Sequence, residues 1–268
     1  MAEWDHDGLT FHYREAGAGI PFFFQHGLGG DVEQPFGLFK PPQGFRLIAF
    51  DCRAHGKTRP VGDHEKIGIA SFADDLRALM DHLEIRQAIV GGISMGAAVS
   101  LNFTLRDPQR VRGLVQSRAA WLGEPNGANA KLFGRIAGWI RRYGAAAGLD
   151  QYYRSELYRQ MLEESPDVAR SLAGQFESPR AAETVVKLER IPHDTPCQGL
   201  DELSTIAVPT LVLANRHDPV HPYLFGTKLA ETIAGAEFVE VTAKSVSEVQ
   251  HGEDVQKYLA EFLQRHFQ

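Results

Sequence analysis

The sequence predicts an α/β protein whose core is a mostly parallel sheet of eight strands with helices on both faces. Compact apolar runs bounded by Gly, Asp or Pro are typical of strands that are buried on both faces. Helical patterns separate these runs, and strand–helix–strand alternation implies right-handed crossovers in a doubly wound sheet. The strongest strand predictions are residues 21–25, 45–50, 88–91, 113–116, 210–214 and 237–241.

The composition limits the function classes. The chain has 268 residues, of which 43% are hydrophobic and 23% charged, a balance that excludes a disordered protein. A net charge of −6 argues against nonspecific nucleic-acid binding. No apolar run approaches the ~18 residues of a membrane span. The polar N-terminal stretch and only two cysteines, Cys52 and Cys197, lead us to expect no secretory signal and a cytoplasmic location. The expected partner is a small-molecule substrate, and the oligomeric state stays open.

Further segments frame the predicted sheet. Residues 9–15 alternate apolar and polar side chains, which predicts an antiparallel arm at the sheet edge. Residues 71–83 carry an apolar stripe at helical spacing, and Ser71 with Asp74 three residues later predicts the N-terminal cap of that helix. A second apolar stripe over residues 255–263 predicts a helix that closes the chain.

The strand pattern is interrupted between the predicted strands 113–116 and 210–214. Residues 124–203 show almost no strand signal and about four helical segments, which predicts an inserted helical cap, or lid, because the stretch is too long for a loop. The predicted core domain then comprises residues 1–123 and 204–268. Most aromatic side chains of the cap are expected to form its own core, and some are expected to roof the site.

The strongest chemical signal is the sequence Gly92-Ile93-Ser94-Met95-Gly96, which follows a predicted strand and precedes a predicted helix. A G-x-S-x-G nucleophile elbow requires this strand–turn–helix context. The turn is so tight that Cβ atoms at Gly92 and Gly96 would clash. We therefore expect Ser94 to be a nucleophile, held in a strained conformation with its hydroxyl exposed above the sheet.

With this elbow the sequence resembles the α/β-hydrolase superfamily, and the resemblance runs nearly end to end. His26-Gly27, directly after the predicted strand 21–25, resembles the oxyanion-loop motif of that family. The segment Asp51-Cys52-Arg53-Ala54-His55-Gly56 resembles its D-x-R-G-x-G turn, with Ala54 in place of the first of two glycines. The resemblance implies a capped α/β-hydrolase fold and no metal or organic cofactor.

A serine nucleophile needs an adjacent base that is oriented by a carboxylate, and the chain order in this fold is serine, acid, histidine. The resemblance implies that Asp218, which follows the predicted strand 210–214, is the acid. The competing position, after the predicted strand 113–116, holds no carboxylate before Glu124. Asp218 is therefore the predicted acid.

The family has its histidine after the last strand and just before the last helix, where this sequence has His251. The loop 244–250 departs from the glycine–histidine sequence that the family frequently has there. His217 and His221 flank the acid but precede the last strand, so His251 is the predicted base.

Two backbone N–H groups are expected to hold the developing oxyanion. One belongs to Met95, which follows the nucleophile at a helix N-terminus, where the helix dipole favours negative charge. By the resemblance, the other belongs to Leu28, in the loop after His26-Gly27. No metal site is predicted, because His64 lacks a second ligand at Gly68, one helical turn later.

These residues predict a serine hydrolase that cleaves an ester, lactone or related acyl bond of a small, largely apolar substrate. Ser94 would attack the carbonyl, His251 would take its proton, and Asp218 would fix the imidazole tautomer. Alternatives on the same triad are a hydrolase of C–C bonds in β-diketones and an acyltransferase. A ligand receptor without turnover is the alternative from another class, because the fold does not choose among these functions.

Overall fold

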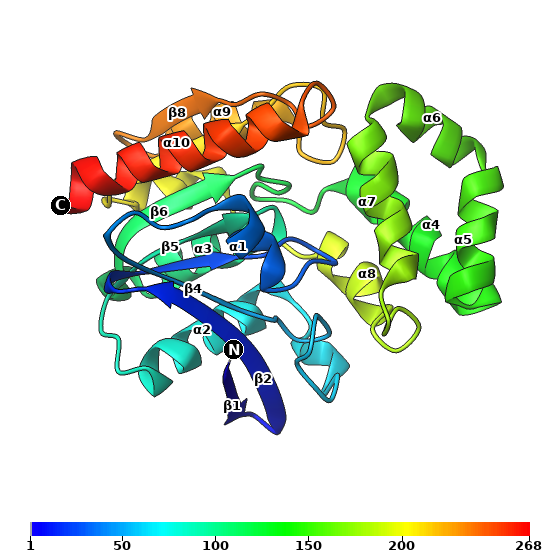
Figure 1. Cartoon of the computed structure of the whole chain (residues 1–268), viewed down its shortest axis with the longest axis horizontal. Coiled ribbons are helices and arrows are strands. Elements are labelled where there is room, and N and C mark those ends of the chain that lie inside the picture. The colour runs from blue at the N-terminus through cyan, green and yellow to red at the C-terminus, as the bar shows by residue number, and fades with distance from the viewer. Residues whose placement is uncertain (1) are drawn as a thin grey trace.

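The computed structural model describes residues 2–268 and contains one eight-stranded sheet (Figure 1). Its strands are β1 (Ala2–His6), β2 (Leu9–Gly17), β3 (Gly19–Gln25), β4 (Gly44–Phe50), β5 (Ala88–Ile93), β6 (Val111–Ser117), β7 (Thr210–Ala214) and β8 (Glu237–Glu240). The strand order is β1-β2-β4-β3-β5-β6-β7-β8. β2 pairs antiparallel with both β1 and β4, and all later pairs are parallel. The predicted fold class is confirmed.

The antiparallel edge contains one strand that the sequence pattern does not single out. The predicted arm at residues 9–15 is β2, and its hairpin partner is β1. Only Trp4 is buried among the residues of β1. A short edge strand with one buried side chain has no alternating pattern to detect.

Five α-helices of the described residues pack on the two faces of this sheet. They are α1 (Glu33–Leu38), α2 (Ile69–His82), α3 (Met95–Arg106), α9 (Tyr223–Thr232) and α10 (Glu248–Phe267). Helices α2, α3 and α9 contribute to one buried apolar cluster, and α10 with the end of α1 contributes to the other. None of the helices in residues 2–268 combines the length and apolar character needed to cross a bilayer.

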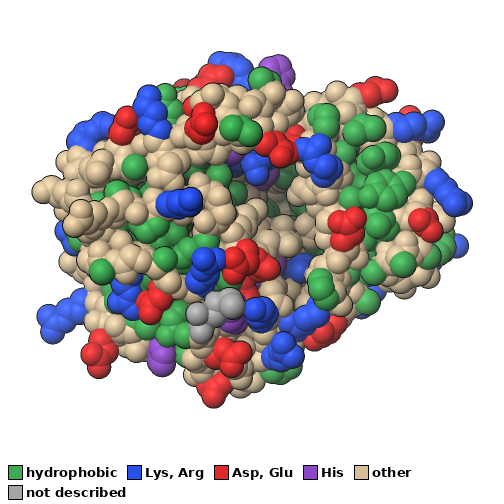
Figure 2. Space-filling view, in the orientation of Figure 1, with side chains coloured by type: hydrophobic (Ala, Val, Ile, Leu, Met, Phe, Trp, Pro, Cys, Tyr) green, Lys and Arg blue, Asp and Glu red, His purple; other side chains and the backbone are tan. Residues whose placement is uncertain are grey.

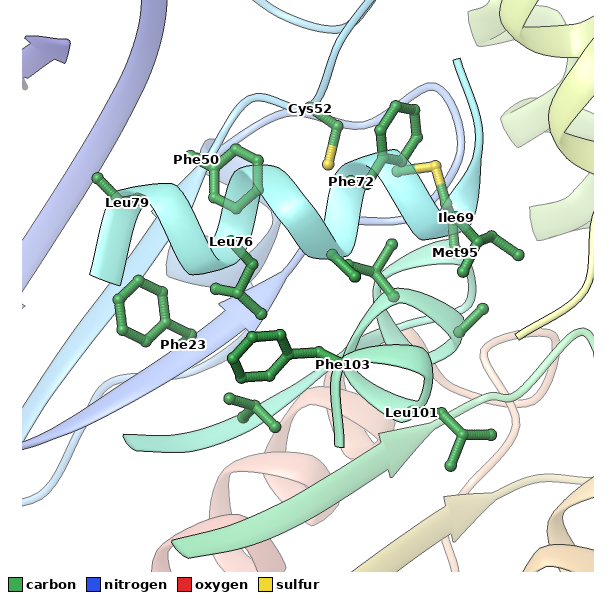
Figure 3. Close-up of a cluster of buried hydrophobic side chains, with 14 of the residues drawn as sticks. Phe23, Phe50, Cys52, Ile69, Phe72, Leu76, Leu79, Met95, Leu101 and Phe103 are labelled. Carbon is green, nitrogen blue, oxygen red and sulfur yellow. The ribbon is translucent and has the colours of Figure 1, made fainter. Parts of the chain in front are cut away.

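The run of three phenylalanines in β3 explains how both faces are filled. Phe23 lies in the cluster with Phe50, Leu76 and Phe103, between the sheet and the helices α2 and α3 (Figure 3). Phe22 and Phe24, its neighbours in the chain, lie in the cluster on the opposite face. Successive side chains of a strand point to opposite faces, so a continuous apolar run marks a strand that is covered on both sides.

Helix α2 begins two residues before the predicted cap. Its N-cap residue is Gly68, and the backbone N–H of Ile69 donates to the carboxylate of Asp194 at 2.7 Å. Asp194 directly follows the short 3₁₀ helix Ile191–His193, far along the chain. The predicted Ser71–Asp74 cap is therefore wrong, because a distant carboxylate caps this helix and a local pattern cannot reveal it.

Between β6 and β7 the described chain forms helices and no strand. The α-helices are α4 (Gly127–Tyr143), α5 (Ala145–Arg154), α6 (Glu156–Glu164), α7 (Pro166–Glu177) and α8 (Val186–Arg190), and the 3₁₀ helices Ile191–His193 and Leu200–Thr205 follow them. We call this segment, residues 124–203, the cap; its helices lie to one side of the sheet in Figure 1 and share their own apolar cluster around Tyr152. These domain boundaries stay a prediction.

The two segments that join the cap to the sheet touch each other. A Cβ atom on Gly123 would lie only 2.9 Å from the Cα of Gly199. The chain therefore leaves and re-enters the cap through adjoining backbones, and a side chain at Gly123 would push them apart.

Candidate active site

Ser94 lies at the sharp turn between β5 and α3. Its φ of 54° and ψ of −109° fall outside the main allowed regions for an L-residue. A Cβ atom on Gly92 would lie 2.3 Å from the carbonyl carbon of Gly96, and a Cβ on Gly96 would lie 2.2 Å from the carbonyl oxygen of Gln25. The predicted strain at Ser94 and the need for both glycines are confirmed.

Ser94 lines a cavity of about 330 Å³ that is enclosed jointly by the sheet side and the cap. Figure 2 shows the surface hollowed between these two parts of the molecule, with charged side chains at the rim. Apolar and charged groups both line this cavity, which we call the serine cavity. The lining includes Leu28, Arg118, Trp121, His221 and Lys244 from the sheet side and Phe133 and Leu172 from the cap.

The two predicted oxyanion donors lie in different parts of the structure. Leu28 lines the serine cavity, and Met95 is the first residue of α3. Neither backbone N–H donates to an acceptor within residues 2–268. The carbonyl of Leu28 accepts a hydrogen bond at 3.3 Å from the side chain of Gln175 in the cap helix α7. Both amides thus lack an acceptor in the described chain, and the cap holds the loop that carries Leu28.

The loop that carries Leu28 is fixed by side chains. Nδ1–H of His26 donates to the carbonyl of Gly27 at 2.8 Å, and its Nε2 accepts from the N–H of Cys52 at 3.1 Å. The N–H of Gly27 donates to Gln34 in α1 at 2.7 Å. Burial lowers the pKa of His26, so it is a neutral structural residue. His26 and Gly27 therefore position the loop.

The Asp51 turn is also structural. The Asp51 carboxylate accepts the backbone N–H groups of Val32 at 2.8 Å and Lys57 at 2.7 Å, and it lies 2.9 Å from Nδ1 of His12. Ala54, which replaces a glycine of the family motif, has a φ of 60°. The turn thus keeps the left-handed conformation that favours glycine, although the residue has changed.

The predicted acid Asp218 follows β7, and only 2% of its side chain is exposed. Its carboxylate accepts two hydrogen bonds from the Arg118 guanidinium, at 2.6 and 3.0 Å. It also accepts Nδ1–H of His221 at 2.9 Å. Burial alone would raise the pKa of Asp218, but His221 and Arg118 hold this pKa well below its usual range. The carboxylate is therefore charged at neutral pH.

His221 lines the serine cavity and is oriented by Asp218. A carboxylate only accepts hydrogen bonds, so Nδ1 of His221 carries the proton and Nε2 has a free lone pair. Burial lowers the pKa of His221 and Arg118 acts in the same direction, whereas Asp218 raises it. A neutral imidazole that is held through Nδ1–H by a carboxylate is the arrangement that a general base requires.

The structure does not bring the predicted base His251 to Asp218. His251 lies inside α10, which begins at Glu248, and its Nδ1–H donates to the carbonyl of Thr242 at 2.8 Å. Its Nε2 has no hydrogen-bond partner within residues 2–268. Burial lowers the pKa of His251 to about 4. Because α10 begins before this residue, His251 is packed in a helix instead of lying on a loop that faces Asp218.

Besides His221, three further residues of the site were not predicted from the sequence. Arg118 follows β6 and has a φ of 51°. Trp121 lines the serine cavity with only 2% of its surface exposed. Lys244 lines it from the loop after β8, where the family frequently has glycine–histidine. The departure of this loop from the family pattern is the one signal that could have drawn attention to Lys244.

Within the described chain, no group of three or more His, Cys, Asp or Glu side chains is arranged to hold a metal ion.

Comparisons with known proteins agree with this architecture. A sequence model described as the alpha/beta hydrolase fold matches residues 20–247. The chain belongs to the alpha/beta hydrolase fold family. It is 25% identical to 3-oxoadipate enol-lactonase 2 of Acinetobacter baylyi over 265 residues, which cover 90% of this chain and 93% of that protein. The family resemblance predicted from the elbow is confirmed.

Two solved structures show the same fold. The enol-lactonase from Burkholderia xenovorans superposes with a TM-score of 0.74 at 24% identity, over 98% of this chain and 100% of that one. MGS-M2, an alpha/beta hydrolase from a deep-sea metagenome library, superposes with a TM-score of 0.78 at 17% identity, over 100% of this chain and 98% of that one. These similarities extend through the cap as well as the sheet.

Proposed function

We propose that this member of the alpha/beta hydrolase family cleaves an ester, lactone or related acyl bond of a small substrate, with Ser94 as the nucleophile. The observation that carries the proposal is that the strained Ser94 and the Asp218-bound His221 line one cavity. The relationship to an enol-lactonase over most of the chain supports a lactone or ester as the substrate.

The proposed reaction has two stages. The Ser94 hydroxyl attacks the carbonyl carbon and gives its proton to Nε2 of His221, while the backbone N–H groups of Leu28 and Met95 bind the oxyanion. The tetrahedral intermediate collapses, and the leaving oxygen takes the proton from His221. Water, deprotonated by His221, then attacks the acyl-enzyme; collapse of the second intermediate returns a proton to Ser94 and releases the acid.

His221 replaces the predicted His251 as the base in this proposal. The imidazolium that forms during catalysis needs a carboxylate beside Nδ1, and Asp218 stands beside His221 at 2.9 Å. His251 has only the carbonyl of Thr242 on its Nδ1, and its lowered pKa makes it a weak base. The role of His251 as base stays a prediction, which the variants below test.

A ligand receptor without turnover is the second candidate, and one contact favours it. The Arg118 guanidinium shares the Asp218 carboxylate with His221, so it opposes the positive charge that the imidazole acquires during catalysis. Hydrolysis of simple aryl esters separates the two candidates, because a receptor releases no nitrophenol in excess of the protein present.

The decisive experiment is labelling with a serine-directed fluorophosphonate. We expect one covalent adduct per chain in the native protein and none in Ser94→Ala, measured by intact mass. Ser171→Ala is the matched control, because Ser171 is a second hydroxyl that lines the same cavity. Labelling of folded Ser94→Ala at the native rate would show that the elbow is not the reactive centre.

A further inference from the structure

The cationic groups of the serine cavity do not all pair directly with a carboxylate. Arg118 is bound to Asp218, and Arg170 pairs with Glu248, which also lines the cavity. Lys244 lines the same cavity but makes no hydrogen bond or ion pair within residues 2–268. An ammonium group that is half-buried without a direct partner loses hydration and gains only the longer-range attraction of nearby carboxylates, and a ligand carboxylate would supply the missing contact.

Lys244 also lies where two cavities adjoin. A second cavity of about 330 Å³ shares five lining residues with the serine cavity and extends toward His251. The shared residues are Gln34, Ile93, Arg118, Lys244 and Glu248. A ligand group that reaches beyond Ser94 can therefore contact Lys244 from either space.

Two fully buried side chains in this connected space also lack partners. Nε1–H of Trp121, a residue that is 2% exposed, has no acceptor within residues 2–268 and lines the serine cavity. Nε2 of His251, a residue that is 1% exposed, is unpartnered and lines the second cavity. Buried polar groups are nearly always hydrogen-bonded, so these orphan atoms indicate a ligand that carries polar groups besides its reacting carbonyl.

We propose that the substrate carries a carboxylate in addition to the scissile acyl group, and that the Lys244 ammonium binds it. The inference rests on the proposed function and narrows the predicted apolar substrate to an acyl compound with one anionic end. Trp121 supplies a further N–H donor to an oxygen of the same substrate.

The electrostatic surroundings of Lys244 suit such a role. Burial lowers the pKa of Lys244, and the neighbouring Arg118 acts in the same direction. Asp167, Glu248 and Asp218 oppose this shift, but none of them pairs with the ammonium directly. A bound carboxylate would offset both the lost hydration and the repulsion from Arg118, so binding an anion stabilises the charged lysine.

The first test compares two esters of equal chain length, mono-p-nitrophenyl adipate and p-nitrophenyl hexanoate. They differ in one end group, which is a carboxylate in the adipate and a methyl in the hexanoate. We expect Lys244→Met to lower the ratio of their kcat/KM values about 10- to 100-fold, mostly through KM for the adipate, as the loss of a charge-assisted hydrogen bond predicts. Lys244→Arg should restore part of the native ratio of the two kcat/KM values. Lys131→Met, on the exposed face of α4, should leave it unchanged.

The second test measures binding without turnover. Calorimetry with adipate should show binding to Ser94→Ala and at least tenfold weaker binding to Ser94→Ala/Lys244→Met. If neither ester is hydrolysed but adipate binding depends on Lys244, the proposed function fails and the carboxylate site stands. The carboxylate site is overturned if Lys244→Met lowers kcat/KM for both esters equally, or if adipate binding does not depend on Lys244.

Discussion

Asp218 accepts a hydrogen bond at 2.9 Å from Nδ1 of His221, which lies only three positions further along the chain. The other carboxylate oxygen accepts the backbone N–H of His221 at 3.1 Å. The acid and the imidazole are therefore paired within one turn after β7. A pair formed with His251 would require the start of α10 to approach this turn, and its Nδ1–H is already bound to Thr242.

This pairing predicts which histidine is essential. We expect His221→Ala to lower kcat on a p-nitrophenyl ester by about 10³-fold or more, because Ser94 loses its base. His251→Ala should cost far less in kcat, since this side chain lines only the second cavity. Steady-state kinetics of both variants, with circular dichroism to check folding, give the comparison.

His217→Ala is the control for disturbance of the loop, because His217 is exposed and adjoins Asp218 without lining the serine cavity. Near-native turnover in folded His221→Ala, together with loss of activity in His251→Ala, would restore the sequence-based assignment of the base.

The pH dependence of kcat/KM gives a second prediction. The base must be neutral, so activity falls as the pH drops through its pKa. Burial first, and then Arg118, lower the pKa of His221 from the ordinary value of 6.5, so the acid limb should lie below pH 6.5. Arg118→Gln removes a cation that disfavours the imidazolium of His221, so the acid limb of this variant should move to higher pH. An acid limb near pH 4 that stays at the same pH in His221→Gln would indicate that His251 is the base instead.

The contact between the cap and the oxyanion loop gives a third prediction. The Gln175 side chain donates to the carbonyl of Leu28, so Gln175→Met should loosen the loop whose N–H binds the oxyanion. We expect kcat to fall about 3- to 10-fold with little change in KM, which corresponds to one neutral hydrogen bond. The same change at Gln160, on the exposed face of α6, is the control. An equal effect of both substitutions would rule out a positioning role for Gln175.

The start of α2 gives a prediction about stability. Asp194→Ala should lower the free energy of unfolding by about 0.5–2 kcal/mol, because it removes the acceptor for the Ile69 N–H. Ser71→Ala should change it far less, since Ser71 lies within the helix and not at its cap. Urea denaturation of both variants measures the difference. A larger loss in Ser71→Ala would favour the local cap that the sequence pattern suggests.

The sheet could be predicted from the sequence because burial on both faces leaves a continuous apolar run. Phe22, Phe23 and Phe24 each reach a core, and no polar residue interrupts them. The elbow could be predicted because it is local: Gly92 and Gly96 lie within two residues of Ser94, and their need for small size follows from the turn itself. Such signals depend on neighbours in the chain.

The rest of the site depends on contacts between distant segments. Arg118 and Asp218 are 100 residues apart, and no local pattern relates them. His251 has the expected place in the sequence, but the earlier start of α10 and the Thr242 carbonyl determine where its ring points. Sequence order predicted Asp218 as the acid, whereas the histidine that pairs with Asp218 depends on how the loops pack.

The contact between Gly123 and Gly199 bears on how such an enzyme changes over evolutionary time. A segment whose two ends adjoin can be exchanged for another of different length or sequence without stretching the sheet to which it is joined. Strands β6 and β7 pair directly, so their register is kept whatever lies between them. Recombination at these two glycines would exchange the roof of the cavity as one unit, while Ser94, Asp218 and His221 stay on the sheet side of the junction.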